Sequence, residues 1–252
     1  MSTLELKNLS KGFGGVRALD KINLSIEDAS VYGLIGPNGA GKTTLFNVLT
    51  GFIKPTAGSV HFLGQDITSK KPYEIARLGI ARTYQNIQLF KNMTVSENVS
   101  TAQNYRAPIG GLKTIFWAGG KGEAKLNENL EYLLDLMGLW NKRNLISMDL
   151  SYGEQRRLEI ARACAMNPKL LLLDEPTAGM NEVETDQLWA RIDELRRNGL
   201  DVVLVEHDMK LVMERCDHIF VLNFGQLIAQ GSPSELRNNK DVIDAYLGKE
   251  ED

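Results

Sequence analysis

The chain has 252 residues, 43% of them hydrophobic, and its 29 basic and 32 acidic side chains give a formal net charge of −3. This length and composition predict a folded protein with a sizeable core in one domain, or in one domain carrying a subdomain, and argue against disorder. This charge balance argues against nucleic-acid binding through a basic surface spread over the whole chain. A local basic patch remains possible.

Three segments near the N-terminus, residues 4–9, 22–26 and 59–63, place an apolar side chain at every second position. This alternation is typical of half-buried antiparallel strands. It also differs from the apolar core of a signal peptide, and no run of the chain approaches the ~20 apolar residues of a membrane span. We therefore expect any membrane association to come through a partner.

A loop with three glycines, GPNGAGKTT at residues 36–44, follows the apolar run VYGLI and precedes LFNVLTG, which has helical spacing. The phosphate-loop pattern G-x-x-x-x-G-K-[ST] is satisfied by Gly36, Gly41, Lys42 and Thr43. Glycines let successive N–H groups converge on phosphates at the positive end of a helix. We expect Lys42 to bridge the β- and γ-phosphates and the Thr43 hydroxyl to ligate Mg²⁺. A glycine-rich turn that merely caps a helix is the alternative.

Residues 92–165 have the sequence pattern of several helical segments, with a glycine-rich interruption at 108–122. We expect them to form a helical subdomain inserted into an α/β core made of residues 1–91 and 166–252. Near its end, in LSYGEQRRLEIARA, Ser151 and Glu154 form a capping box for a helix that runs to Asn167-Pro168.

The same helix start offers a second function, because a serine and a glycine at a helix N-terminus also make a phosphate-facing surface. One chain cannot easily bring this surface and the glycine loop to the same γ-phosphate, so the functional interpretation predicts a dimer. The basic runs EQRR and ELRRNG carry no such meaning, and we expect them to be solvated helix surface.

Two later segments, KLLLLDE at 169–175 and DVVLVEH at 201–207, are uniformly apolar before they end in charged residues. Such runs indicate parallel strands that are covered on both faces, and the pattern from 183 to 198 between them predicts a helix. Strand, helix and strand around a phosphate loop predict an α/β fold. A hairpin turning near 223–226 and a short helix from about residue 234 complete the chain.

Asp174 and Glu175 close the first of these strands, where ligands bind in α/β proteins. Asp174 can hold Mg²⁺, directly or through water, and Glu175 can orient and deprotonate the attacking water. Two solvated carboxylates at a strand end are the alternative. The two cysteines, Cys164 and Cys216, are too few for a disulfide framework and lack metal-ligand spacing, which fits a reducing cytosol.

These segments in this order resemble an ATP-binding-cassette (ABC) ATPase over nearly the whole chain. LSYGEQ resembles the family signature LSGGQ, with Tyr152 and Glu154 in place of one of its glycines and its glutamine. Gln85 matches the glutamine loop, His207 the switch histidine, and AGMN the loop after the catalytic strand, with Asn181 where many members have aspartate. Phe13 matches the aromatic residue that stacks on adenine.

The resemblance implies a P-loop NTPase core with an N-terminal antiparallel β-subdomain and an inserted α-helical subdomain. It also implies a head-to-tail dimer that sandwiches two ATP molecules, with Glu175, His207 and Gln85 as catalytic residues and Thr43, Gln85 and Asp174 around Mg²⁺. The implied nucleotide contacts are Phe13, Val16, Gly36, Pro37, Asn38, Gly39, Ala40, Gly41, Lys42, Thr43 and Thr44, with Ser151, Gly153 and Glu154 acting across the dimer. Taken alone, Phe13 would be a core aromatic and Gln85 and His207 ordinary polar residues.

Finer patterns, such as RTYQNIQLFKNMTVSENV and the ending VIDAYLG, resemble the ATPases of branched-chain amino acid importers. This implies transmembrane permease subunits, a second copy or a paralogous ATPase as dimer partner, a solute-binding protein reached indirectly, and a peripheral place on the cytoplasmic face of the membrane. Urea importer and lipopolysaccharide-export ATPases share this texture and stay open as alternatives.

A soluble ABC ATPase acting on nucleic acid or ribosomes is the alternative from another class. The chain has neither the long coiled coil of the repair type nor the tandem cassette of the translation type, so we expect no nucleic-acid partner. A GTPase is disfavoured because NNKDV places its aspartate one position too early for base recognition, and a simple kinase leaves residues 150–163 unexplained.

Overall fold

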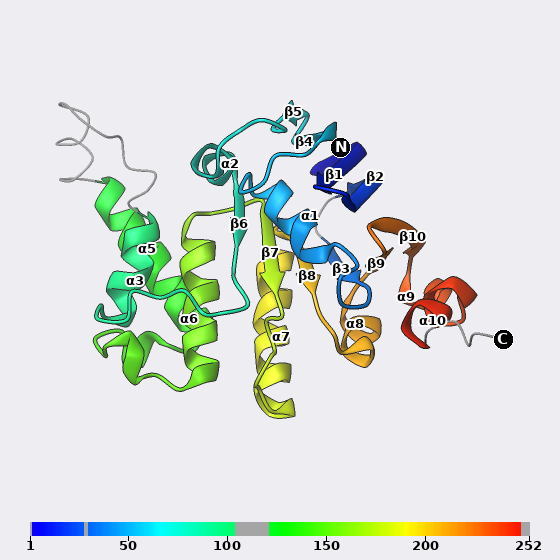
Figure 1. Cartoon of the computed structure of the whole chain (residues 1–252). Coiled ribbons are helices and arrows are strands. Elements are labelled where there is room, and N and C mark those ends of the chain that lie inside the picture. The colour runs from blue at the N-terminus through cyan, green and yellow to red at the C-terminus, as the bar shows by residue number, and fades with distance from the viewer. Residues whose placement is uncertain (1, 28–29, 104–120, 248–252) are drawn as a thin grey trace. The chain divides into compact units, whose positions relative to one another are not determined.

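The computed structural model describes residues 2–27, 30–103 and 121–247 (Figure 1). The chain divides into two compact units. The first holds residues 1–80, 169–175 and 195–252, and the second holds residues 81–168 and 176–194. The predicted helical subdomain at 92–165 falls within the second unit, while its predicted glycine-rich interruption lies mostly at 104–120, outside the described residues.

An antiparallel sheet in the first unit has the strand order β2-β1-β4-β5. Its strands are β1 (Leu4–Phe13), β2 (Val16–Ile26), β4 (Ala57–Phe62) and β5 (Gln65–Asp66). On β1, Leu4 pairs with Ile26 and Phe62, which gathers apolar side chains on one face. The three alternating strands expected from the sequence are confirmed, and β1 and β2 are longer than the alternation alone indicated.

The larger sheet has the order β10-β9-β3-β8-β7-β6. Its strands are β3 (Val31–Ile35), β6 (Ile80–Arg82), β7 (Leu170–Asp174), β8 (Asp201–Val205), β9 (His218–Asn223) and β10 (Gln226–Gly231). Every residue of β3, β7 and β8 is buried, and these strands run parallel, as their apolar runs predicted. Val205 pairs with both Leu34 and Asp174, so the strands that lead to the glycine loop and to the two carboxylates end at the same edge.

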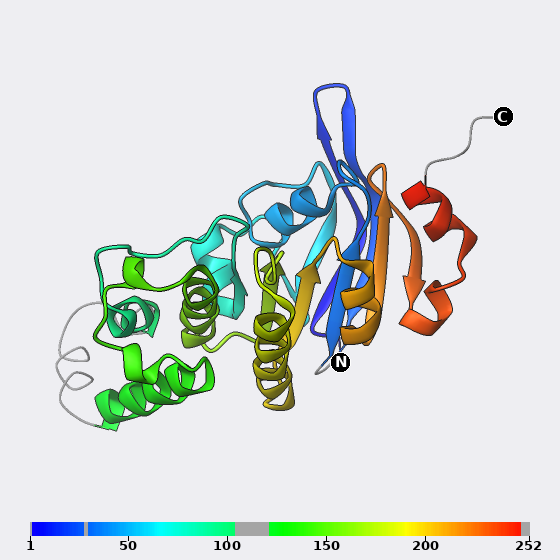
Figure 2. The ribbon, with the colours of Figure 1, turned by 90° about the horizontal axis from the view of Figure 1, so that it is seen from below.

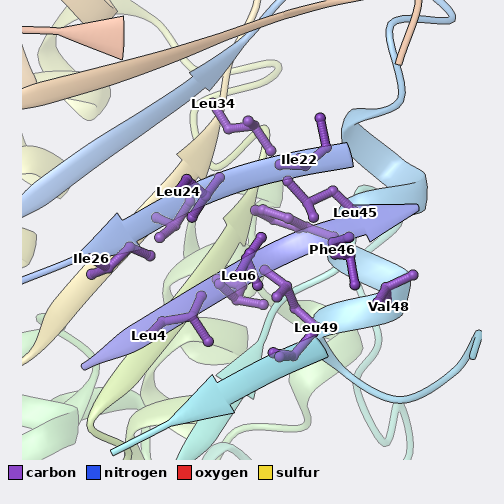
Figure 3. Close-up of a cluster of buried hydrophobic side chains, with 14 of the residues drawn as sticks. Leu4, Leu6, Ile22, Leu24, Ile26, Leu34, Leu45, Phe46, Val48 and Leu49 are labelled. Carbon is purple, nitrogen blue, oxygen red and sulfur yellow. The ribbon is translucent and has the colours of Figure 1, made fainter. Parts of the chain in front are cut away.

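Helix α1 (Lys42–Leu49) is held by the core of the first unit. Four of its side chains, Leu45, Phe46, Val48 and Leu49, are buried in a cluster with apolar residues of β1 and β2, as Figure 3 shows. Burying each such side chain stabilises the fold by about 1.5–3 kcal/mol. Because the glycine loop leads directly into α1, this packing fixes one end of the loop, and β3 fixes the other.

The second unit contains α3 (Val95–Gln103), α5 (Lys121–Leu136) and α6 (Tyr152–Ala165), with α6 packed against both of the others. Two 3₁₀ turns, Trp140–Lys142 and Ser147–Asp149, connect α5 to α6. The capping box predicted at Ser151 and Glu154 is confirmed. Helix α7 (Glu182–Arg197) matches the helix expected at 183–198.

The remaining helices belong to the first unit: α2 (Pro72–Leu78), α8 (Met209–Arg215), α9 (Pro233–Leu236) and α10 (Lys240–Leu247). The hairpin of β9 and β10 is confirmed, but two helices follow it where one was expected. The side chain of Asn239 accepts hydrogen bonds from the N–H groups of Asp241 and Val242 and so starts a new helix. Over the described ranges, no helix combines the length and the apolar character that crossing a membrane requires.

Candidate active site

The glycine loop at residues 36–44 has a backbone that only glycine can adopt at two positions. Gly36 has φ +147°, and a Cβ there would lie 2.1 Å from the carbonyl oxygen of Leu222. Gly41, the N-cap of α1, has φ +107°, and its Cβ would lie 2.6 Å from the carbonyl oxygen of Ala18. The loop is therefore curled tightly against β2 and β9, as a phosphate cradle requires.

The N-terminus of α1 suits an anion. No side chain caps it, and its first turn holds no acidic residue. Lys42 is buried in this turn, and its Nζ donates hydrogen bonds to the carbonyl oxygens of Gly36 and Pro37, at 2.5 and 3.0 Å. Burial lowers the pKa of Lys42, while the charges of Glu175 and Asp174 act to raise it. The lysine thus lies folded over the loop with its ammonium in the field of both carboxylates.

The predicted pair of carboxylates takes two different environments. Asp174 is the last residue of β7 and is buried, whereas Glu175 has a left-handed backbone with φ +47°. A conformation of this kind costs about 1–3 kcal/mol in a non-glycine residue and is typical of functional sites. The Glu175 N–H donates to the carbonyl oxygen of Val205 at 2.9 Å, which fixes this turn of the chain.

His207 meets Glu175 directly. Its Nε2 lies 2.6 Å from the Glu175 carboxylate oxygen Oε1, so a protonated Nε2 donates to the carboxylate. The side chain of His207 is about half exposed. The predicted catalytic glutamate and switch histidine, which are 32 residues apart in the chain, are therefore in contact.

Phe13 and Val16 flank the turn between β1 and β2, and the turned view of Figure 2 shows this hairpin projecting from the first unit. Phe13 is 47% exposed and Val16 is 69% exposed. The Lys11 Nζ lies 4.9 Å from the centre of the Phe13 ring. The alternative that Phe13 is a core aromatic is therefore wrong, and its ring is available for stacking.

In the second unit, the polar groups at the start of α6 form hydrogen bonds with one another. The Ser151 hydroxyl accepts from the Glu154 N–H, and the Glu154 carboxylate accepts from the Ser151 N–H. Glu154 Oε1 also lies 2.6 Å from Lys142 Nζ. Burial acts to raise the pKa of Glu154, but the hydrogen bonds from Lys142 and Ser151 outweigh it and the net shift is downward. The expected contact of Ser151, Gly153 and Glu154 with a partner's nucleotide stays a prediction.

Gln85 lies on the exposed loop after β6, and the backbone of this loop is held from α6. Arg156 Nη1 donates to the carbonyl oxygen of Tyr84 at 2.6 Å, and its Nη2 donates to that of Gln85 at 2.9 Å. Glu159 pairs with Arg156 at 2.8 Å and accepts from the N–H groups of Tyr84 and Gln88. We call Arg156 and Glu159 the buried clamp.

The expectation that EQRR is solvated helix surface is wrong for Arg156, whose side chain is 0% exposed. The sequence carried a signal that could have shown this, since Arg156 and Glu159 are three residues apart on one helix face, where opposite charges pair. Both are drawn inward because the loop after β6 offers backbone groups that need partners.

The residues present fit a magnesium ion only in part. Thr43, on α1 after β3, and Asp174, the last residue of β7, belong to segments whose strands end at one edge of the sheet. Across the residues that the structure describes, no group of three or more His, Cys, Asp or Glu side chains could hold a metal. Mg²⁺ bound here would therefore take most of its ligands from nucleotide phosphates and water, as Mg²⁺ usually does.

Residues 19–178 match the family described as ABC transporter. The chain belongs to the ABC transporter family. Its fold is that of an ABC cassette: a nucleotide-free ATP-binding cassette from an ABC transporter aligns with a TM-score of 0.85 at 33% identity, covering 99% of this chain and 100% of the other. A cassette solved in its ADP conformation gives the same TM-score and coverage at 34% identity. The predictions of the α/β cassette fold and of an ATPase are confirmed.

The curated relatives of this cassette also align with it over nearly their full length. It is 45% identical to the high-affinity branched-chain amino acid transport ATP-binding protein BraF of Pseudomonas aeruginosa, over 98% of both chains. It is 44% identical to LivG of Escherichia coli K12, which has the same description, again over 98% of both. Residues 226–252 also match a family described as Branched-chain amino acid ATP-binding cassette transporter.

Two departures of this cassette from the family pattern have a structural basis in the second unit. The ring of Tyr152 packs on Gly179, where a Cβ would lie 3.2 Å from ring atom Cε1. Asn181 Oδ1 accepts from the Glu184 N–H at 2.9 Å, and the Glu184 carboxylate accepts from the Asn181 N–H at 3.1 Å. Asn181 therefore caps the start of α7, a role for which asparagine is as suitable as aspartate.

Within its first unit, the cassette brings together the glycine loop, Asp174, Glu175 and His207. Gln85 and the signature residues Ser151, Gly153 and Glu154 belong to its second unit. Two residues in contact with these groups were missed from the sequence: Arg156, discussed above, and Tyr246, whose hydroxyl accepts a hydrogen bond from the Gly36 N–H.

Proposed function

We propose that this ABC ATPase hydrolyses ATP as a head-to-tail nucleotide-sandwich dimer and powers the import of branched-chain amino acids through membrane permease subunits. The match of residues 226–252 to the branched-chain amino acid family carries the solute assignment. This segment lies outside the region that the general ABC transporter family covers, so it adds information that the ATPase motifs lack. The names of the full-length relatives agree with it.

The first unit supplies the nucleotide contacts of this proposal. Phe13 stacks on adenine beside Val16, and Lys42 neutralises the β- and γ-phosphates. The backbone N–H groups and hydroxyls that cradle the phosphates come from Asn38, Gly39, Ala40, Gly41, Thr43 and Thr44. Gly36, whose N–H is held by Tyr246, and Pro37, which has no N–H, shape the start of the loop. Bound Mg²⁺ would be held by Thr43 and Asp174 of this unit, with Gln85 of the second unit as the further expected ligand, and it would offset the negative charge of the phosphates.

Hydrolysis follows from the contact of Glu175 with His207. His207 Nε2 lies 2.6 Å from Glu175 Oε1, and a protonated Nε2 donates to the carboxylate. When a γ-phosphate arrives, this donor turns to a phosphate oxygen and frees the carboxylate to accept a proton from the attacking water. The water oxygen bonds to the γ-phosphorus, the bond from phosphorus to the bridging oxygen breaks, and the electron pair stays on ADP.

The second unit supplies the partner-facing surfaces. Ser151, Gly153 and Glu154, at the positive end of the 14-residue helix α6, reach the γ-phosphate of a second copy or of a paralogous ATPase. A cavity of about 300 Å³ in the same unit has an apolar lining that includes Phe90, with Arg162 lying 5.4 Å above its ring. We assign this cavity and the Gln85 loop to the permease contact, which places the ATPase peripherally on the cytoplasmic face of the membrane. A solute-binding protein then acts only through the permease.

The test is uptake of labelled leucine, with labelled urea in parallel, in cells that lack this chain and are rescued by wild type or by Glu175→Gln. We expect leucine uptake to be lost on deletion and restored only by wild type. The purified variant should still bind ATP while its turnover falls about 10²–10⁴-fold, because the general base is gone.

Other outcomes would reassign the transporter. Loss of urea uptake with normal leucine uptake would indicate a urea importer. Unchanged uptake of both, with export of lipopolysaccharide impaired, would indicate the export ATPase. Co-purification with nucleic acid or ribosomes in place of membranes would overturn transport altogether.

A further inference from the structure

The C-terminal helix reaches the glycine loop through one hydroxyl group. Tyr246 on α10 accepts a hydrogen bond from the backbone N–H of Gly36, with 2.8 Å between nitrogen and oxygen. The two residues are 210 positions apart in the chain, and Gly36 is the first residue of the loop. This contact joins the segment that matches the branched-chain amino acid family to the loop that the general ABC pattern defines.

The Gly36 residue has its two polar backbone groups engaged. Its N–H is held by Tyr246, and its carbonyl oxygen accepts from Lys42 Nζ. Its Cα is pressed against the carbonyl oxygen of Leu222, since an added Cβ would lie 2.1 Å away. The residue therefore sits between the C-terminal helix and the lysine, and the Tyr246 hydroxyl fixes one of its hydrogen bonds.

The hydroxyl contact is directional and is not a by-product of close packing. A groove of about 820 Å³ lies between the loop and α10, and its lining includes Asn38 from the loop and Asp241 and Asp244 from α10. Helix α10 is attached to the first unit independently through Val242, which is 4% exposed and lies one turn before Tyr246 on the same face. Removing the hydroxyl therefore leaves the anchor of the helix in place.

We propose that Tyr246 is a positioning residue that holds the Gly36 backbone, and through it Lys42, in the curvature that nucleotide phosphates need. The C-terminal helix then contributes to the ATP affinity of this cassette without touching the nucleotide. The inference rests on the proposed role of residues 36–44 in binding the phosphates.

The test is Tyr246→Phe, which keeps the ring and removes only the hydroxyl, with Tyr73→Phe on α2 as the matched control. One hydrogen bond of this kind corresponds to about a three- to tenfold change in an equilibrium. We expect the dissociation constant and the KM for ATP to rise by this factor in Tyr246→Phe, with kcat unchanged. The loop is ordered before the chemical step, so the loss falls on binding and not on turnover.

A second measurement separates positioning from simple packing. Hydrogen exchange of the peptide that contains Gly36 should become faster in Tyr246→Phe and stay at the wild-type rate in Tyr73→Phe. A lowered unfolding midpoint without faster exchange at Gly36 would assign Tyr246 a packing role and overturn the inference.

Unchanged ATP affinity in Tyr246→Phe, while wild type binds ATP and Lys42→Ala does not, would overturn the inference and leave the proposed function standing. Failure of the wild type itself to bind ATP would overturn both.

Discussion

Replacing one member of the buried clamp should damage the second unit and its glutamine loop together. Glu159→Gln keeps the shape of the side chain but removes its charge. Arg156, with 0% of its side chain exposed, then keeps a buried positive charge without its carboxylate. The amide group that replaces one carboxylate oxygen can only donate, so it faces the donors of Arg156 or of the loop backbone.

The structure sets the size of this effect. The pair is at 2.8 Å, and the Glu159 side chain is 2% exposed, so solvent screens little of the interaction. Removing one partner of such a pair typically costs about 3–5 kcal/mol. An exposed carboxylate lost from the same unit, as in Glu131→Gln on α5, should change the free energy of unfolding by less than about 0.5 kcal/mol.

Urea unfolding of the full chain, followed by circular dichroism, measures the free energy, and ATP turnover reports the position of Gln85. We expect Glu159→Gln to lose both stability and kcat, and Glu131→Gln to lose neither. The double variant Arg156→Met, Glu159→Leu removes both charges and should recover much of the stability, but not the turnover, because the loop backbone stays without its partners.

A loss below about 1 kcal/mol in Glu159→Gln would show that the pair is screened and would refute the burial argument. Wild-type turnover in the double variant would refute the role of the clamp in holding Gln85.

Three further predictions concern the first unit and the two thiols. Phe13→Ala should weaken ATP binding by about 1–3 kcal/mol through lost stacking and leave stability nearly unchanged, because the side chain is exposed; calorimetry and a Phe13→Tyr control check this. Gly36→Ala should destabilise the fold by about 2–5 kcal/mol, measured in urea, because it combines overpacking with a left-handed backbone. Burial raises the pKa of Cys164 and Cys216 to about 12, so both should react with a thiol reagent at pH 8 only after unfolding. The stability that the raised thiol pKa values contribute is complete below the ordinary thiol pKa of about 8.5 and is lost as the pH rises toward 12. The free energy of unfolding should therefore be lower at pH 9.5 than at pH 7.

Much of the first unit was predictable because its signals are local. Alternation with period two placed the antiparallel strands, and uniformly apolar runs placed the parallel ones. The order of Gly36, Lys42 and Thr43 predicted a tight loop between a strand and a helix, and the structure has β3, this loop and α1 in that order. Phosphate binding by the loop stays a prediction. The carboxylates at 174–175 followed from their position at the end of a buried strand.

The contacts that brace these residues were not predictable in the same way, because they join distant segments. Nothing near Tyr246 in the sequence indicates that its hydroxyl meets Gly36, 210 residues earlier. A basic run such as EQRR has the composition of helix surface, and only the fold shows that Arg156 turns inward to carbonyl groups 71 and 72 residues away. The second C-terminal helix was missed for a different reason, since Asn239 looks like a turn residue as readily as a helix cap.

The two braces lie in different units and have the same physical effect. Tyr246 holds the first residue of the phosphate loop in one unit, and the clamp of Arg156 and Glu159 holds the Gln85 loop in the other. Neither brace touches the expected nucleotide atoms, yet each removes conformational freedom that binding would otherwise have to remove. In the proposed dimer, ATP binding energy is then available for association of the two copies, instead of ordering each loop. Variants of either brace should therefore weaken nucleotide-driven dimerisation more than their local hydrogen bonds account for, and sedimentation of Tyr246→Phe with ATP measures that excess directly. If dimerisation fell only in proportion to ATP affinity, the loop would be ordered by the nucleotide itself and the brace would have no part in closure.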